Sequence, residues 1–374
     1  MQYDEVRLAR LQKMMADRGY DAVVLVSPEN IAYGAGFVVP SQILMRWRHA
    51  AVVVTAAGEV AVVCVDMEGE TVRQARPGWE VRTWHEFRDN AMHVLASTLA
   101  SLGLGSANIG TEFNYFAVNQ FKDLKEALPS AKFSAADDDF TQVRRIKSPR
   151  ELELLTRLSR ISDTAILTAL RGVKAGDTEM DIAAELTRSV YEQGAQAFKL
   201  MIVATGERSE LPNVGPSLRV LQHGDICRVE IFSVIDGYQA GVCRTASVGE
   251  PDAVASGIYR NLVECKHLVR DAIKPGAAAS SVYSVYRKHF DKMQMPPIAF
   301  VGHSIGVNLH EAPYLGAESA DVLESGMVLG MEPLVYRTGH GYGMQIKDMV
   351  SVADNGCILL SDVSDTDSMI LVES

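Results

Sequence analysis

One stretch, VEIFSVIDGYQAGVCRT at 229–245, constrains the fold of this chain more than any other. Two apolar runs flank Asp236-Gly237, and an Asp-Gly pair between such runs predicts a β-hairpin. Glu230 is the residue that this reading leaves unexplained, because it lies inside the first apolar run. A carboxylate buried in a sheet needs a partner. The stretch therefore predicts a hairpin and raises the question of what Glu230 faces.

The composition is that of an ordinary globular protein. The 374 residues are 47% hydrophobic and 22% charged, and the net charge of −11 comes without a basic block. We therefore expect neither nucleic acid nor an anionic membrane as a partner. The charged N-terminus lacks the apolar core of a signal peptide. Five scattered cysteines without CxxC spacing are typical of reduced thiols, which predicts a cytoplasmic protein.

The first part of the chain alternates helix and strand signals. Residues 4–18 have helical spacing, AVVLVS at 22–27 is a short buried strand, and RHAAVVVTAAGEVAVVCV predicts two strands around a Gly turn. An acidic cluster and Ser148-Pro149 then mark a boundary, since Pro is favoured in the first turn of a helix. We predict an α/β domain at 1–140 and a second domain at 141–374.

The second part repeats one order of elements. Two helices precede paired strands, and two further helices precede further strands. The expected ranges are 149–172, 177–194 and 199–248, then 254–273, 279–292 and 299–360. Helices followed by strands in blocks predict an α+β domain, with the helices on one face of an antiparallel sheet. The repeat lies in the architecture, because the two halves share little sequence.

Polar residues interrupt four of these apolar segments. Glu230 has been named; the others are His303 and His310 in FVGHSIGVNLHEAP, Glu332 in MVLGMEPLV and Lys347 in GMQIKDMVSV. Each one alone is more typical of a satisfied structural residue. As a set on one sheet they would have to pair with each other or with a ligand, because burying several ionisable groups is costly. The set predicts an active site.

The ordered motifs resemble a known family. GHSIGVNLHE, SGMVLGMEP and GMQIKDMVSVADNG, with VRRIKSPRELELL and VKAGDTEMDIAAEL upstream, resemble the pita-bread hydrolases: methionine and Xaa-Pro aminopeptidases, prolidases and creatinase. The resemblance implies a creatinase-type N-terminal domain. It also implies a pita-bread catalytic domain, whose repeat of helices and antiparallel sheet is related by a pseudo-twofold axis.

The metal ligands of the family's peptidases are only partly present. Carried across by position, two Asp, one His and two Glu fall on Glu230, Gly241, His303, Glu332 and Lys347. Gly offers no ligand, and an ammonium repels a divalent ion. The resemblance to metal-free creatinase therefore implies a site with no metal and no cofactor. A single metal on the three retained ligands is an alternative.

The remaining candidate site residues follow from the polar residues that are present and from the family resemblance. His303, His310, Glu332 and Glu230 would be catalytic, with His310 donating to an oxyanion and His303 serving as the base. The loop position that carries the catalytic His in creatinase is Asn213, which cannot act as a base. The expected substrate-binding residues are Asn213, Lys347, Cys243, Arg48 and, on a mobile rim at 337–344, His340.

Arg48 is the residue on which the prediction of a homodimer depends. MRWRHAAVVVT resembles the creatinase stretch from which an arginine reaches the neighbouring subunit's site, and Arg48 matches that arginine while Arg46 precedes it. The resemblance implies a homodimer in which Arg48 clamps a substrate carboxylate. Alternatively, both arginines are simply exposed before a strand.

Three functions follow from these residues. The first is a metal-independent, creatinase-like hydrolase that cleaves a non-peptide C–N bond of a small zwitterionic or cationic amidine, guanidine or amide. The second is a metal-dependent Xaa-Pro dipeptidase or aminopeptidase. The third is a non-hydrolytic lyase or a small-molecule-binding relative, since folds outlive functions.

Overall fold

The computed structural model describes residues 4–374 and divides the chain into two compact units. The first unit ends at Arg144, and the second covers Arg145–Ser374. Each unit has its own sheet and its own apolar core, so each is described separately. None of the helices in the described part of the chain combines the length and the hydrophobicity that a membrane crossing needs.

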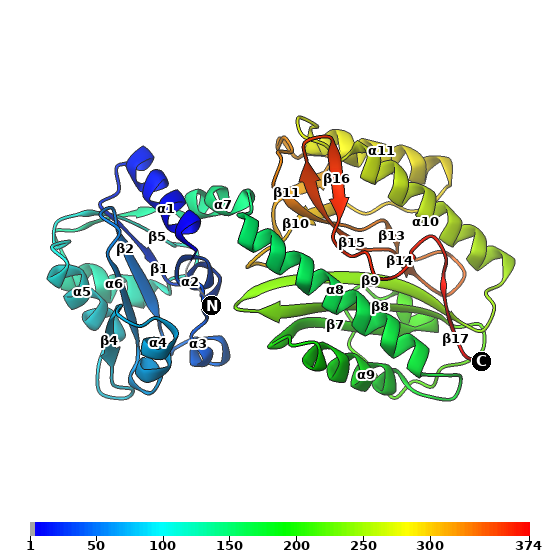
Figure 1. The fold of residues 1–374 in the computed structure, drawn as a ribbon, viewed down its shortest axis with the longest axis horizontal. Coiled ribbons are helices and arrows are strands. Elements are labelled where there is room, and N and C mark those ends of the chain that lie inside the picture. The colour runs from blue at the N-terminus through cyan, green and yellow to red at the C-terminus, as the bar shows by residue number, and fades with distance from the viewer. Residues whose placement is uncertain (1–3) are drawn as a thin grey trace. The chain divides into compact units, whose positions relative to one another are not determined.

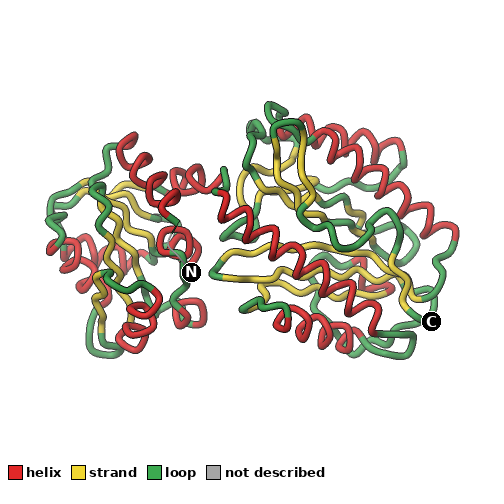
Figure 2. The backbone as a smooth tube through the Cα atoms, viewed as in Figure 1, coloured by secondary structure: helices red, strands yellow, loops and turns green. Residues whose placement is uncertain are grey.

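The first unit is an α/β layer structure in which helices pack on both faces of a central sheet (Figure 2). The strand order β4-β3-β2-β1-β5-β6 is mixed, because β1–β2 and β2–β3 pair antiparallel and the other neighbours pair parallel. The strands are β1 Ala22–Leu25, β2 Ala51–Thr55, β3 Val60–Val65, β4 Glu80–Trp84, β5 Asn108–Thr111 and β6 Lys132–Ala135. The helices are α1 Glu5–Arg18, α2 Pro28–Ala35, α3 Pro40–Leu44, η1 Asp66–Glu68, α4 Gly69–Ala75, α5 Ala91–Ser101, α6 Val118–Ala127 and α7 Asp137–Arg145.

The first half of the second unit contains the hairpin that the sequence predicts. Its elements are α8 Pro149–Gly172, α9 Glu179–Glu192, β7 Ala197–Thr205, η2 Gly206–Glu210, β8 Ile226–Ile235 and β9 Tyr238–Val248. The helices α8 and α9 cover one face of the sheet β17-β9-β8-β7 (Figure 1). Ile235 pairs with Tyr238, and Asp236 and Gly237 both have positive φ, as a two-residue turn of this kind requires.

The second half repeats the order of two helices followed by strands. Its elements are α10 Ala253–Ala272, α11 Ala279–Lys292, β10 Phe300–Ser304, β11 Glu311–Gly316, β12 Val328–Met331, β13 Leu334–Val335, β14 Met344–Gln345, β15 Asp348–Ala353, β16 Gly356–Leu359 and β17 Ile370–Val372. The second sheet has the order β11-β10-β12-β15-β16, and α10 and α11 pack on it (Figure 1).

Equivalent backbone contacts recur in the two halves. The Gly176 N–H donates to the carbonyl of Leu221 at 2.9 Å, and the Gly276 N–H donates to that of Leu323 at 2.8 Å. Both glycines have positive φ in the turn that precedes the second helix of their half. The α+β class and the repeat of helices and antiparallel sheet are therefore confirmed.

Candidate functional site

The polar residues that interrupt the apolar segments come together where the two sheets of the second unit meet. Glu230 lies on β8, His303 on β10, Glu332 directly after β12 and Lys347 directly before β15. Lys347 also joins the two sheets through its backbone. Its N–H donates to the carbonyl of Cys243 on β9 at 3.1 Å, and its carbonyl accepts from the Cys243 N–H at 3.2 Å.

The ammonium of Lys347 is the centre of the cluster. Its Nζ lies 3.3 Å from Glu230 Oε1, 3.0 Å from Glu332 Oε2 and 3.2 Å from His303 Nε2. All four side chains are buried. An ammonium has three donors and here faces three acceptors, so its hydrogen-bonding capacity is matched. Two carboxylates and one ammonium leave one net negative charge.

Burial and charge act in opposite directions on these groups. Burial of Glu332 disfavours its ionised form, but the Lys347 ammonium outweighs burial and holds the pKa of Glu332 well below its usual range. Burial likewise disfavours the charged form of Lys347, and the two carboxylates outweigh it and raise the pKa of Lys347 above its ordinary value. The ion pair is therefore charged throughout the neutral range.

The two histidines stack face to face. The ring centroids of His303 and His310 are 3.6 Å apart, and the ring planes differ by 12°. His303 Nδ1 lies 2.9 Å from the carbonyl of Ser304, so Nδ1 carries the proton and Nε2 accepts from Lys347. Packing of the inner face of His310, together with the nearby His303 and Lys347, lowers the pKa of His310 to about 4, although its outer edge is exposed. His310 is thus neutral at pH 7.

Phe232 fills the place beside Gly241, where the family's peptidases have their second Asp. These two residues pair directly across the hairpin, and a Cβ built on Gly241 would lie 2.4 Å from the Phe232 ring. The Lys347 ammonium lies 4.7 Å from the centre of the same ring, within the range of a cation–π contact. An aromatic ring and an ammonium therefore occupy the position that a second ligand would need.

The residues of this cluster do not fit a two-metal centre. Glu230, His303 and Glu332 are the possible ligands, and Lys347 bonds to all three. Within residues 4–374 no group of three or more His, Cys, Asp or Glu side chains is arranged to hold a metal ion.

Two further residues extend the cluster, and the sequence reading missed both. Gln345 Nε2 donates to Glu332 Oε2 at 3.2 Å, and Arg228 Nη1 donates to Gln345 Oε1 at 3.1 Å. Arg228 is fully buried, and its guanidinium lies 5.4 Å from the centre of the Tyr336 ring. The place of Arg228 in the hairpin gave a signal, because Arg228, Glu230 and Phe232 alternate along β8 and so face the same side.

The structure does not bring every expected substrate-binding residue into the cluster. Cys243 is fully buried beside it, and burial raises the pKa of its thiol well above the ordinary value, so it is not a nucleophile. Asn213 and His340 are exposed on loops. Thr338 and Tyr342 close the turn that carries His340, since Thr338 Oγ1 donates to the Tyr342 carbonyl at 2.6 Å.

Arg48 lies in the first unit and has a partner there. Its Nε and Nη2 each lie 2.9 Å from one carboxylate oxygen of Glu86, which is a bidentate pair. Arg46 donates to the carbonyl of Tyr115 at 3.1 Å and stacks over the Tyr115 ring. Both arginines thus have contacts within their own unit, and a role for Arg48 in a partner subunit stays a prediction.

Comparisons with known proteins give a consistent result. Residues 153–354 match the model of metallopeptidase family M24, and residues 7–146 match the creatinase/prolidase N-terminal domain. The chain is 27% identical to a Xaa-Pro dipeptidase of Pyrococcus furiosus over 94% of this chain and 96% of that protein. It is 29% identical to a probable dipeptidase, PepE, of Mycobacterium tuberculosis over 95% and 94% of the two chains. Among solved structures, an X-Pro aminopeptidase from Thermotoga maritima superposes with a TM-score of 0.86 at 24% identity, covering 98% of this chain and 99% of that one.

These comparisons correct the first functional expectation. A creatinase-like, metal-independent hydrolase of a non-peptide C–N bond is wrong, because the matching family is one of metallopeptidases and the similar proteins with named activities are dipeptidases and an aminopeptidase. The creatinase-type character of the first domain is confirmed. The inference from Gly241 and Lys347 to creatinase failed because lost metal ligands show only that a site has changed, whereas similarity along the whole chain indicates the substrate class.

Proposed function

Because the chain belongs to metallopeptidase family M24, whose members are hydrolases of C–N bonds, we propose that it acts on small peptides of the Xaa-Pro dipeptide class. The observation that carries this proposal is similarity to dipeptidases along nearly the whole length of both chains. A shared catalytic domain alone would be weaker support, because one fold hosts many reactions.

The chemistry of the cluster suits two groups of a dipeptide, the α-ammonium group and the carbonyl of the scissile bond. One net negative charge at Glu230, Glu332 and Lys347 favours the α-ammonium group of the substrate. The neutral His310, exposed at its edge, has a ring N–H with which to polarise the carbonyl of the scissile bond. His303 holds the His310 ring by stacking, and the Ser304 carbonyl fixes the orientation of His303.

A second candidate function is binding of the same class of molecule without turnover. One observation favours it: Lys347 bonds to both carboxylates and to His303, and so occupies the groups that would otherwise activate a water. A hydrolase requires one of these groups to be released when the substrate binds. A binding protein requires no such change.

The two candidates separate in one set of measurements. Purified protein is incubated with Xaa-Pro dipeptides, with and without added Mn²⁺ or Co²⁺, and free proline is quantified while calorimetry measures binding. Proline release that is lost in a Glu332→Gln variant supports the hydrolase. Saturable binding without proline release supports the binding protein. Absence of both binding and release under all metal conditions refutes both candidates.

We also propose a homodimer and a cytoplasmic location. The dimer would let Arg48 act in the partner's site, which requires Arg48 to share or leave Glu86. The free state of all five cysteines supports a reducing compartment.

A further inference from the structure

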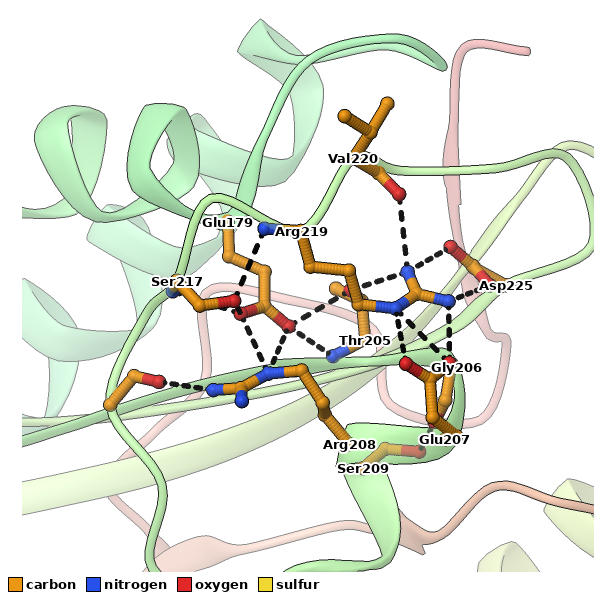
Figure 3. Close-up of polar contacts among 11 residues, drawn as sticks. Glu179, Thr205, Gly206, Glu207, Arg208, Ser209, Ser217, Arg219, Val220 and Asp225 are labelled. Atoms are coloured by element: carbon orange, nitrogen blue, oxygen red, sulfur yellow. Dashed lines mark hydrogen bonds and ion pairs between the residues drawn. The ribbon is translucent and has the colours of Figure 1, made fainter.

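A second polar network in the same unit is centred on the buried Glu179 (Figure 3). Glu179 is the first residue of α9, and its side chain is fully buried. Its carboxylate accepts hydrogen bonds from Thr205 N (2.8 Å) and Thr205 Oγ1 (3.0 Å), from Arg208 Nε (3.0 Å), and from Ser217 N (2.9 Å) and Ser217 Oγ (2.6 Å). One side chain thus binds the last residue of β7, Thr205, and two separate points of the segment that follows β7.

That segment, residues 206–219, is a loop closed on itself, and we call it the β7–β8 loop. Arg208 Nη2 donates to the Gly215 carbonyl at 2.7 Å, which ties the start of the loop to its later part. Arg219 at its end pairs with Asp225 at 2.6 Å and with Glu207 at 2.8 Å (Figure 3). The loop is therefore fastened at both ends, while Asn213 between them is exposed.

The β7–β8 loop is connected to the candidate active site by one buried side chain. Arg228 donates from Nε to the Ser209 carbonyl at 3.2 Å and from Nη2 to the carbonyls of Leu211 and Pro212, the latter at 3.0 Å. Its remaining nitrogen, Nη1, donates to Gln345, which in turn donates to Glu332. The position of the loop and the position of the Glu332 carboxylate are thus linked through two side chains.

The second half of the internal repeat indicates that the fold itself does not require a carboxylate at the position of Glu179. The Glu179 N–H donates to the Arg219 carbonyl at 3.1 Å, and in the second half the Ala279 N–H donates to the Asp321 carbonyl at 2.9 Å. The neighbouring bridges, Thr178 with Val220 and Ala278 with Val322, also correspond. The same backbone arrangement therefore forms around an alanine. The carboxylate is needed only where the β7–β8 loop lies.

We infer that Glu179 is a positioning residue that fixes the β7–β8 loop, through Thr205, Arg208 and Ser217, so that the loop determines which substrates fit beside Glu332. The part about substrates rests on the proposed dipeptide function. Leu211, Pro212 and Asn213 are the exposed side chains that the fixed loop presents at or next to its contacts with Arg228. A loop held in one conformation binds with a smaller loss of entropy than a mobile one.

The test compares Glu179→Gln with Glu207→Gln in the full-length protein. Both changes remove one negative charge beside an arginine of the same loop, but Glu207 is exposed and its partner Arg219 keeps Asp225. Hydrogen exchange of peptides from 205–219 is the first readout. We expect Glu179→Gln to speed exchange there by about tenfold or more, since a buried charged acceptor of several hydrogen bonds is lost, and Glu207→Gln to leave it unchanged.

The second readout is selectivity among Xaa-Pro dipeptides. Glu179→Gln should raise KM or the binding Kd several-fold and narrow the differences between substrates, with kcat changed less. Ser217→Ala, which keeps the carboxylate and removes one donor, should show the same pattern more weakly and replaces Glu179→Gln if that variant does not fold. Unchanged exchange in both variants, or equal effects of Glu179→Gln and Glu207→Gln, would overturn the inference. If no dipeptide binds to the wild-type protein the proposed function fails, and the exchange data still decide whether Glu179 fixes the loop.

Discussion

Replacing Lys347 by Met tests the central claim that one ammonium holds the buried cluster together. Met is close to Lys in length and apolar, so the change removes the charge with little change in volume. Glu230 then loses its contact at 3.3 Å and Glu332 loses its contact at 3.0 Å. Glu332 keeps its hydrogen bond from Gln345, which limits the loss at that residue.

The expected loss of stability follows from the buried carboxylates that are left without their cation. Removing one partner of a buried ion pair typically costs about 3–5 kcal/mol, because the remaining charge stays buried. Here two carboxylates share one cation, so we expect a loss of about 3–5 kcal/mol in the free energy of unfolding at pH 8. An exposed pair serves as the control: Arg287→Met breaks the pair with Asp291, whose side chains are 50% and 55% exposed, and should cost less than about 0.5 kcal/mol.

The pH dependence of the free energy of unfolding provides a second, independent test. In the wild-type protein the pKa of Glu332 is lowered, so its contribution is present above the ordinary carboxyl pKa and lost as the pH falls through the lowered value. The pKa of Lys347 is raised, so its contribution is present below the ordinary lysine pKa and lost only as the pH rises through the raised value. The wild-type cluster is therefore fully effective from about pH 5 to pH 9.

The variant should behave in the opposite way. Without the ammonium, burial of Glu332 is no longer outweighed and raises the pKa of its carboxyl group, so a proton binds on folding and the variant gains stability as the pH falls from 8 to 5. The difference from wild type should shrink by up to about 1.4 kcal/mol per pH unit in that range for each group that titrates.

The assay uses the distribution of tryptophans between the units. All three, Trp47, Trp79 and Trp84, lie in the first unit, so their fluorescence during urea unfolding reports that unit alone. Circular dichroism reports both units. We expect the fluorescence transition to stay in place and the remaining circular dichroism transition to move to lower urea. A shift below about 1 kcal/mol, or one that does not depend on pH, would refute the claim that Lys347 compensates two buried carboxylates.

Four other predictions concern separate parts of the protein. Gly241→Ala should lower stability by about 1–3 kcal/mol in urea unfolding, because its Cβ would lie 2.4 Å from the Phe232 ring, and Phe232→Leu in the same background should recover part of the loss. Binding or turnover should show no inflection near pH 6.5 from His310, whose pKa of about 4 keeps it neutral; a pH profile with such an inflection that disappears in His310→Gln would contradict this. Calorimetric titration with Mn²⁺ should find fewer than two tightly bound ions per chain, and two would contradict the poor fit of the cluster to a two-metal centre. If Arg48 acts across a dimer, mixing inactive Arg48→Ala and Glu332→Gln proteins should restore part of the activity, whereas no restoration after subunit exchange would rule that role out.

The sequence predicted the fold well because local signals agreed with one another. The Asp236-Gly237 turn set the register of the hairpin, and Ser148-Pro149 marked the start of α8, where Ser148 accepts from the Glu151 N–H. Helical and strand periodicities then placed the remaining elements of the second unit within a few residues. Such signals are short-range, so they can be read from the chain directly.

The candidate site was predicted in part. Glu230, His303, Glu332 and Lys347 stood out because ionisable residues are rare in apolar strands. Gln345 and Arg228 did not, although the two residues connect Glu332 to a loop more than a hundred positions earlier in the chain. Contacts of this kind depend on how two sheets meet, which no local pattern encodes.

The function was misread for a related reason. Gly241 and Lys347 show that metal ligands are missing, and that loss was taken as likeness to creatinase. Substrate class depends instead on many weak contacts over the whole chain, and only comparison along its full length reflects them. The network around Glu179 was also missed, because a Glu in the first turn of a helix is ordinary there.

The pairing of Phe232 with Gly241 opposes single substitutions that would lead back to a metal-binding arrangement. An Asp at position 241 would meet the aromatic ring, a smaller residue at 232 alone would leave a cavity beneath a buried ammonium, and a Glu at 347 alone would place three carboxylates together. Each single step toward a metal-binding arrangement thus lowers stability while the site still lacks a full set of ligands. Packing around Phe232 and Gly241 therefore tends to preserve the present arrangement. Rebuilding a two-metal centre by design would require changing positions 232, 241 and 347 together.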